Sequence, residues 1–116
     1  MMDYQELLHA LGENAGRSIA DELDTHDIPT HMREPLLRYV VEGRMVGDFL
    51  TAVLSNDLMR AVQFADAVNR ERLAGYARFL YNCVPSGAYG STERVAAWRR
   101  SEGLLGMLSA EKAGTR

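Results

Sequence analysis

The stretch that decides the fold is Phe49-Leu-Thr-Ala-Val-Leu-Ser-Asn-Asp-Leu58. It is an apolar helical segment that stops at Ser55-Asn-Asp57 and restarts, because Ser and Asn cap helices and Asp57 is favourable in the first turn of the next one. Helical periods of apolar residues recur on both sides of this stretch, and no alternating strand pattern is present in the sequence. The sequence therefore predicts an all-α protein, a compact single-domain bundle of about five to seven short helices.

The composition agrees with one folded domain. The 116 residues are 47% hydrophobic and 25% charged, with a net charge of −3. This balance argues against disorder, and the mildly acidic charge argues against general nucleic-acid binding. No stretch approaches the ~20 apolar residues that span a bilayer, and residues 1–11 lack a signal-peptide pattern. We therefore expect no contact with membranes. The single Cys83 cannot form an intramolecular disulfide, so we expect a cytoplasmic protein.

Outward from the deciding stretch, residues 1–27 are predicted to form an N-terminal helix. Asp3 and Glu6 have the spacing of a capping box, which marks the start of this helix. Gly12 and Gly16 begin a stripe of small residues that allows another helix to approach closely. Two interpretations are open, namely close packing within the chain, which we favour, and self-association.

Residues 28–103 are predicted to form the core of the domain. Ile28-Pro29 ends the first helix, because the residue before a proline avoids the helical conformation. A second helix is expected over residues 32–42, with Gly43 as its left-handed terminator. Asp48 is expected to cap the short third helix, which contains the apolar residues of the deciding stretch.

The chain after residue 58 has less certain boundaries. One helix can run from Leu58 to Cys83, or it can break at the polar and charged residues 69–72. Residues 104–116 form a C-terminal tail. Its segment Leu104–Leu108 is too apolar to be free in water and should dock on the body or on a partner, whereas residues 110–116 should fray.

The loop over residues 85–91 is the candidate for binding a small ligand. Its glycines allow backbone amides to converge where the next helix exposes unpaired N–H groups, an arrangement that suits an anion. Nearby hydroxyls, arginines and aromatic rings would add contacts to phosphates and bases. The simpler interpretation, which we favour, is a helix-to-helix turn whose aromatic residues fill the core. The candidate ligand-binding residues are Gly87, Tyr89, Gly90, Ser91, Thr92, Arg94, Tyr81, Trp98 and Arg44.

No catalytic or metal site is predicted. The loop lacks the Gly-Lys-Ser/Thr ending of a P-loop, so nucleotide hydrolysis is not indicated. The three histidines, His9, His26 and His31, lie far in sequence from Cys83, and a deliberate zinc site needs three or four well-placed ligands. Cys83 is expected to be an inert buried thiol, and we expect no enzyme activity and no cofactor.

A group of short motifs carries a resemblance to a known family. The motifs are Ile28-Pro29, Arg38-Tyr39-Val40, Gly43, Gly47 to Leu58, Ala65-Asp66, Phe79-Leu-Tyr-Asn82, Pro85, Gly90-Ser91 and Trp98. Over about residues 28–103 the chain resembles a family of small, uncharacterised, all-helical proteins encoded by bacteriophages and prophages. The resemblance implies a genomic setting, in which the protein acts in the cytoplasm of a host cell. It transfers no catalytic residues.

In that setting two functions are open, and both are non-enzymatic. The first is an anti-defence protein, a homo-oligomer that sequesters a small phosphorylated, nucleotide-like ligand at the loop of residues 87–92. The alternative is a protein–protein interaction module that inhibits a host defence complex. This module would use the apolar tail Leu104–Leu108 or the small-residue stripe of the first helix.

Overall fold

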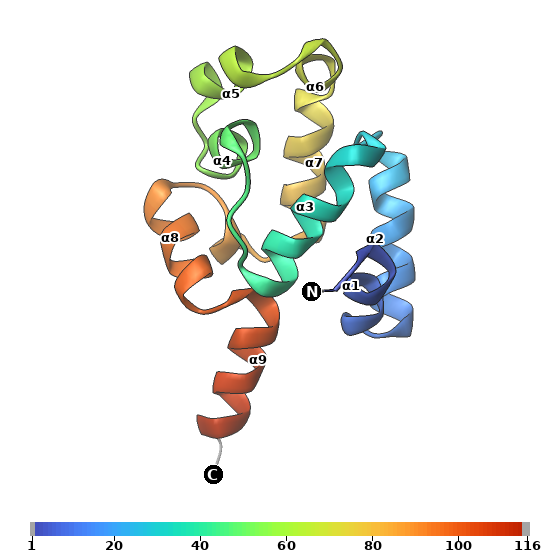
Figure 1. Ribbon diagram of the computed structural model, residues 1–116, viewed down its shortest axis with the longest axis vertical. Coiled ribbons are helices and arrows are strands. Elements are labelled where there is room, and N and C mark those ends of the chain that lie inside the picture. The colour runs from blue at the N-terminus through green and yellow to red at the C-terminus, as the bar shows by residue number, and fades with distance from the viewer. Residues whose placement is uncertain (1, 115–116) are drawn as a thin grey trace.

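The computed structural model describes residues 2–114 and, of their side chains, those up to residue 110. Within these residues the protein is all-helical, as predicted, and forms one compact globule. The described residues form nine α-helices rather than five to seven, and one 3₁₀ turn (Figure 1). The elements are α1 (Tyr4–Ala10), α2 (Glu13–Thr25), α3 (Thr30–Glu42), α4 (Asp48–Leu54), α5 (Leu58–Phe64), α6 (Ala67–Glu71), α7 (Leu73–Cys83), the 3₁₀ turn η1 (Ser86–Ala88), α8 (Thr92–Arg100) and α9 (Gly103–Gly114).

The predicted N-terminal helix is two helices that fold back on each other. The capping box is confirmed, since Asp3 accepts from the Glu6 amide at 2.9 Å and Glu6 accepts from the Asp3 amide at 3.1 Å. The single helix is wrong because Gly12 adopts a φ of +97° and ends it. Gly16 lies against the Leu8 carbonyl, where a Cβ atom would clash. Gly16 of the small-residue stripe therefore serves packing of α2 on α1 within the chain, whereas Gly12 has open space beside it.

The middle of the chain keeps the predicted turn and adds two breaks. Asn56 has a φ of +63°, and Asp57 caps α5 by accepting from the Arg60 amide at 3.1 Å. Leu58 to Cys83 is not one helix. The first break lies at Ala65, which is extended, and Asp66 then caps α6. The second break lies at Arg72, within residues 69–72, where the sequence allowed a break.

Two details of the predicted helix starts are corrected. The helix predicted over residues 32–42 begins at Thr30, two residues earlier, so Pro35 lies beyond its first turn. The N-cap of α4 is Gly47, so Asp48 is the first helical residue and not the cap. Gly43 does end α3 in the left-handed conformation, with a φ of +70°.

The core is built around α3. Figure 1 shows this helix between the α1–α2 pair and the helices α4 and α8, while α7 packs directly on α2. Tyr39 is fully buried and donates from its hydroxyl to the Ala88 carbonyl at 2.7 Å, while its own carbonyl accepts from the Trp98 indole at 3.1 Å. Phe49 and Tyr76 meet edge to face, with ring centres 5.2 Å apart. These contacts join α3, α4, α7 and α8 into one apolar centre.

The C-terminal tail is a helix that projects from the body, as Figure 1 shows. Gly43 and Gly103, both with positive φ, lie backbone to backbone where α3 ends and α9 begins. Within the tail, Leu104 and Leu105 pack against the core, whereas Met107 and Leu108 are exposed. The predicted docking of the tail thus holds for its first part only. The backbone is helical to Gly114, and residues 115 and 116, also predicted to fray, lie outside the described residues.

No helix between residues 2 and 114 combines the length and the apolar character that crossing a bilayer requires.

Candidate functional site

The loop that precedes α8 uses its polar groups to hold its own shape. Ser91 caps α8 by accepting from the Arg94 amide at 3.1 Å. The amide of Gly90 donates to the Leu54 carbonyl at 2.7 Å, and the Thr92 hydroxyl bonds a Glu93 oxygen at 3.1 Å. The Gly90 amide and the Thr92 hydroxyl, both predicted to face an anion, are thus bonded to other groups of the chain.

The charges at this loop also disfavour an anion. Arg94 folds back over the loop and donates from one guanidinium nitrogen to the carbonyls of Ser86 and Tyr89, at 3.2 and 3.4 Å. Glu93 lies in the first turn of α8, and hydrogen bonds from its own backbone amide and from Thr92 lower the pKa of its carboxyl. A carboxylate therefore already accompanies the positive end of the helix dipole.

The other predicted ligand-binding residues are dispersed. Trp98 is 3% exposed and belongs to the core, so its ring offers no free face, and the exposed Gly87 lies beside that ring. Arg44 lies in a different hollow, together with Glu42 and Glu102, between the end of α3 and α9. The structure does not bring these residues together with the loop into one phosphate site.

Three of the predicted residues do share a groove. Tyr81, Tyr89 and Gly90 line it together with Val53, in the last turn of α4, and Asn56, which follows that helix. This α4–α7 groove has a volume of about 470 Å³ and mostly apolar walls. The Tyr81 side chain stands at its edge and is 80% exposed.

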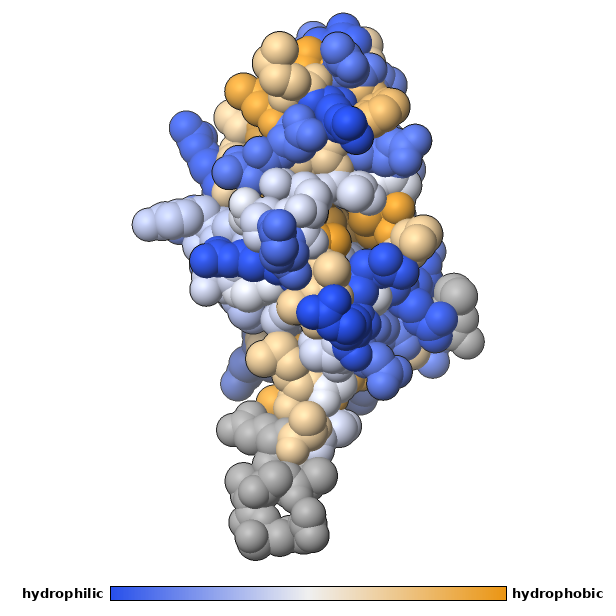
Figure 2. Space-filling model, turned by 90° about the vertical axis from the view of Figure 1, so that its left-hand side faces the viewer, coloured by the Kyte–Doolittle hydropathy of each residue, from blue (hydrophilic) through white to orange (hydrophobic). Residues whose placement is uncertain are grey.

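The groove continues toward an exposed apolar surface. A smaller hollow shares Val53, Asn56 and Ala77 with the groove and extends it to Leu58, which is 66% exposed. Further exposed apolar side chains follow along α5, on which Leu58 lies, and on α6. Figure 2 shows apolar atoms at the end of the molecule that these two helices form. We call this set the α5–α6 apolar surface; it comprises Leu58, Met59, Val62, Phe64 and Val68.

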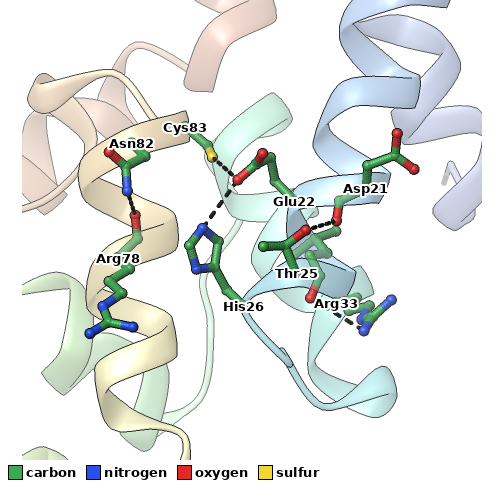
Figure 3. A network of polar contacts seen from close by, with 9 residues as sticks. Asp21, Glu22, Thr25, His26, Arg33, Arg78, Asn82 and Cys83 are labelled. Carbon is green, nitrogen blue, oxygen red and sulfur yellow. Dashed lines mark hydrogen bonds and ion pairs between the residues drawn. The ribbon is translucent and has the colours of Figure 1, made fainter.

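A second arrangement, not predicted from the sequence, joins the ends of α2 and α7. Glu22 lies in the last turn of α2, His26 is the C-cap of that helix, and Cys83 is the last residue of α7. One oxygen of Glu22 lies 3.1 Å from His26 Nε2 and 3.7 Å from Cys83 Sγ (Figure 3). The i, i+4 spacing of Glu22 and His26 is visible in the sequence, but only the packing of α7 on α2 brings Cys83 to them.

The chemistry of this cluster is not that of an activated nucleophile. Burial first, and then the charge and hydrogen bond of Glu22, raise the pKa of the Cys83 thiol to about 11. An attacking cysteine needs a depressed pKa and an imidazole as its base. Here the neighbouring acceptor is a carboxylate, so the thiol keeps its proton near neutral pH. This agrees with the predicted inert thiol, although Cys83 is only partly buried.

Comparison of the sequence with protein-family models and with curated proteins, and of the structure with solved structures, finds no match. The resemblance to the bacteriophage family stays a prediction.

Proposed function

We propose that this chain is a non-enzymatic binding protein that holds an apolar helix of a partner protein in the α4–α7 groove. The observation that carries the proposal is the continuity of the groove with the α5–α6 apolar surface. Contiguous exposed apolar surface on a small protein marks an interaction site, and exposed aromatic residues such as Tyr81 are enriched at such sites.

The groove also suggests the character of its occupant. A helix with apolar residues three and four positions apart can place them against Val53, Ala77 and Leu80 along one line. Arg78 lines the same groove and favours an acidic residue beside the apolar face of the partner. In the phage setting that the resemblance implies, the partner would belong to a host defence complex.

A photo-crosslinking amino acid at position 81 tests this proposal. In the expression host, the variant is expected to form a protein adduct that mass spectrometry assigns to one partner helix. The matched control carries the crosslinker at Met45, which is nearly as exposed as Tyr81 but lies on the segment between α3 and α4. Adducts that are equal at both positions, or that persist in a Leu58→Asp background, would count against the groove.

The second candidate is sequestration of a small nucleotide-like ligand in the same groove. It is supported by the two tyrosines, Tyr81 and Tyr89, and by Arg78, which offer rings for a base and a cation for a phosphate. Arg94, Trp98 and Arg44 have no part in this version of the site. Native mass spectrometry with a panel of cyclic and linear nucleotides tests it, with Arg78→Ala as the variant expected to lose the ligand.

The same native mass spectra give the number of chains per particle and so test the predicted homo-oligomer. Exposed apolar side chains at both ends of the molecule, on α5–α6 and at Met107 and Leu108, support association of copies. A monomeric mass over a wide range of protein concentration would refute the homo-oligomer, while leaving the groove proposal to the crosslinking experiment.

A further inference from the structure

We infer that Glu22, His26 and Cys83 form a three-ligand site for Zn²⁺ at the junction of α2 and α7. Their donor atoms, a carboxylate oxygen, an imidazole nitrogen and a thiol sulfur, all lie within 4.8 Å of one another. This arrangement comes from two helices and is separate from the groove proposed to bind a partner, so it stands whether or not that function is correct.

Two of the three donor separations agree with a tetrahedral zinc centre. Zinc lies about 2.3 Å from sulfur and about 2.0–2.1 Å from nitrogen and oxygen ligands. For tetrahedral angles these lengths put nitrogen and oxygen about 3.3 Å apart, and sulfur and oxygen about 3.6 Å apart. The observed distances are 3.1 Å from His26 to Glu22 and 3.7 Å from Cys83 to Glu22. The third separation, between the Cys83 sulfur and the His26 nitrogen, is within 4.8 Å. Tetrahedral angles put these two atoms about 3.6 Å apart, so side-chain rotation brings them together around an ion.

The donor set selects the kind of cation. Sulfur and imidazole ligands favour zinc and similar transition metals, whereas magnesium and calcium prefer oxygen ligands alone. One sulfur, one nitrogen and one oxygen donor leave the fourth tetrahedral position to a water molecule. The site is therefore expected to take Zn²⁺, and Co²⁺ as its spectroscopic substitute. Cys83 binds the ion as a thiolate and releases its proton to solvent when the ion binds.

The position of the cluster allows an ion to enter from solvent. The His26 side chain is only 14% exposed, but that of Glu22 is 39% exposed and faces solvent at the cluster's edge. An open hollow between the two helices includes Glu22, Cys83 and Asn82 in its walls. Figure 3 shows two groups pointing toward the Glu22 carboxylate: the His26 ring, from the end of α2, and the Cys83 sulfur, from the end of α7.

The backbone holds the two helices close enough for the site. Gly75 lies on α7 against the His26 carbonyl, in a position where a Cβ atom would clash. This contact fixes the height of α7 along the last turn of α2, and with it the distance from Cys83 to His26. Gly75 is thus a positioning residue for the proposed site.

Titration of untagged, chelator-treated protein with Co²⁺ tests the site, because a cobalt–thiolate bond gives a charge-transfer band in the near ultraviolet. We expect this band at one ion per chain and its displacement by Zn²⁺. Cys83→Ser should abolish the band, and His26→Asn should weaken Zn²⁺ binding at least tenfold, roughly the lower bound seen when groups around a metal are removed.

The control is His31→Asn, which removes an exposed histidine outside the cluster and should leave Zn²⁺ affinity unchanged. Circular dichroism of each variant shows whether the fold is retained, and Glu22→Gln provides a second test if His26→Asn does not fold. Absence of the thiolate band in the folded wild-type protein, or equal affinities in His26→Asn and His31→Asn, would overturn the site.

Discussion

At the scale of single residues, Tyr39 joins three elements through two hydrogen bonds. Its hydroxyl donates to the Ala88 carbonyl in η1, and its carbonyl accepts from Trp98 in α8. Tyr39→Phe removes only the first bond and leaves the buried Ala88 carbonyl without this partner. We expect the free energy of unfolding in urea to fall by about 1–3 kcal/mol. Tyr81→Phe is the control, because that hydroxyl is exposed, and a change of the same size there would contradict the explanation.

The reactivity of Cys83 depends on its neighbour Glu22. After burial, the carboxylate of Glu22 is the main cause of the raised pKa of the thiol. Glu22→Gln removes the negative charge, so the thiol pKa falls and a larger fraction is thiolate at a given pH. In chelator-treated protein we expect faster alkylation by iodoacetamide in the variant than in wild type at the same mildly alkaline pH. An equal or slower rate would show that the carboxylate does not hold the thiol proton.

At the scale of elements, the packing of α7 on α2 depends on Gly75. A Cβ atom at this position would meet the His26 carbonyl, which is backbone and cannot swing away. Gly75→Ala is expected to lower the free energy of unfolding by about 1–3 kcal/mol, the usual cost of an overpacked contact. Gly87→Ala is the control, since a Cβ there is 4.0 Å from the Trp98 ring and fits. Equal thermal stability of the two variants would refute this role for Gly75.

The element boundaries show which parts of the fold are readable from the sequence. Helix caps are local, so Asp3 with Glu6, Gly43 and Ser91 all mark real helix ends. The break at Gly12 was missed, because an isolated glycine can also sit inside a helix at a cost of about 1 kcal/mol. It becomes a break when α1 can fold back against Gly16, and that contact is tertiary.

The candidate site likewise has a part that the sequence predicts and a part that depends on tertiary packing. Tyr81, Tyr89 and Gly90 were predicted and do line one groove. Trp98 and Arg94 were predicted from their proximity in sequence to the loop, but their partners, the Tyr39 carbonyl and the loop's own carbonyls, are set by packing. The cluster of Glu22, His26 and Cys83 could not be predicted from the sequence, because it too depends on packing, here of α7 on α2.

At the scale of the whole molecule, buried tyrosines control stability in alkali. Burial raises the pKa of Tyr39 to about 12, and burial followed by the charge of Asp66 raises that of Tyr76. Each hydroxyl holds its proton more tightly in the folded protein than in the unfolded chain, where the pKa is about 10. The resulting stabilisation is complete below pH 10 and is lost as the pH rises through the folded pKa values.

We therefore expect the free energy of unfolding in urea to decrease above pH 10, by roughly 2–3 kcal/mol for Tyr39 alone once its folded pKa of about 12 is reached. Cys83, with a pKa raised to about 11, adds to the decrease, starting about one pH unit lower, at the unfolded pKa of a thiol. Tyr39→Phe lowers stability at neutral pH but removes one ionising group, so its stability should decline less steeply in alkali than that of wild type. Parallel pH profiles for the two proteins would show that the Tyr39 hydroxyl is not what couples the fold to pH.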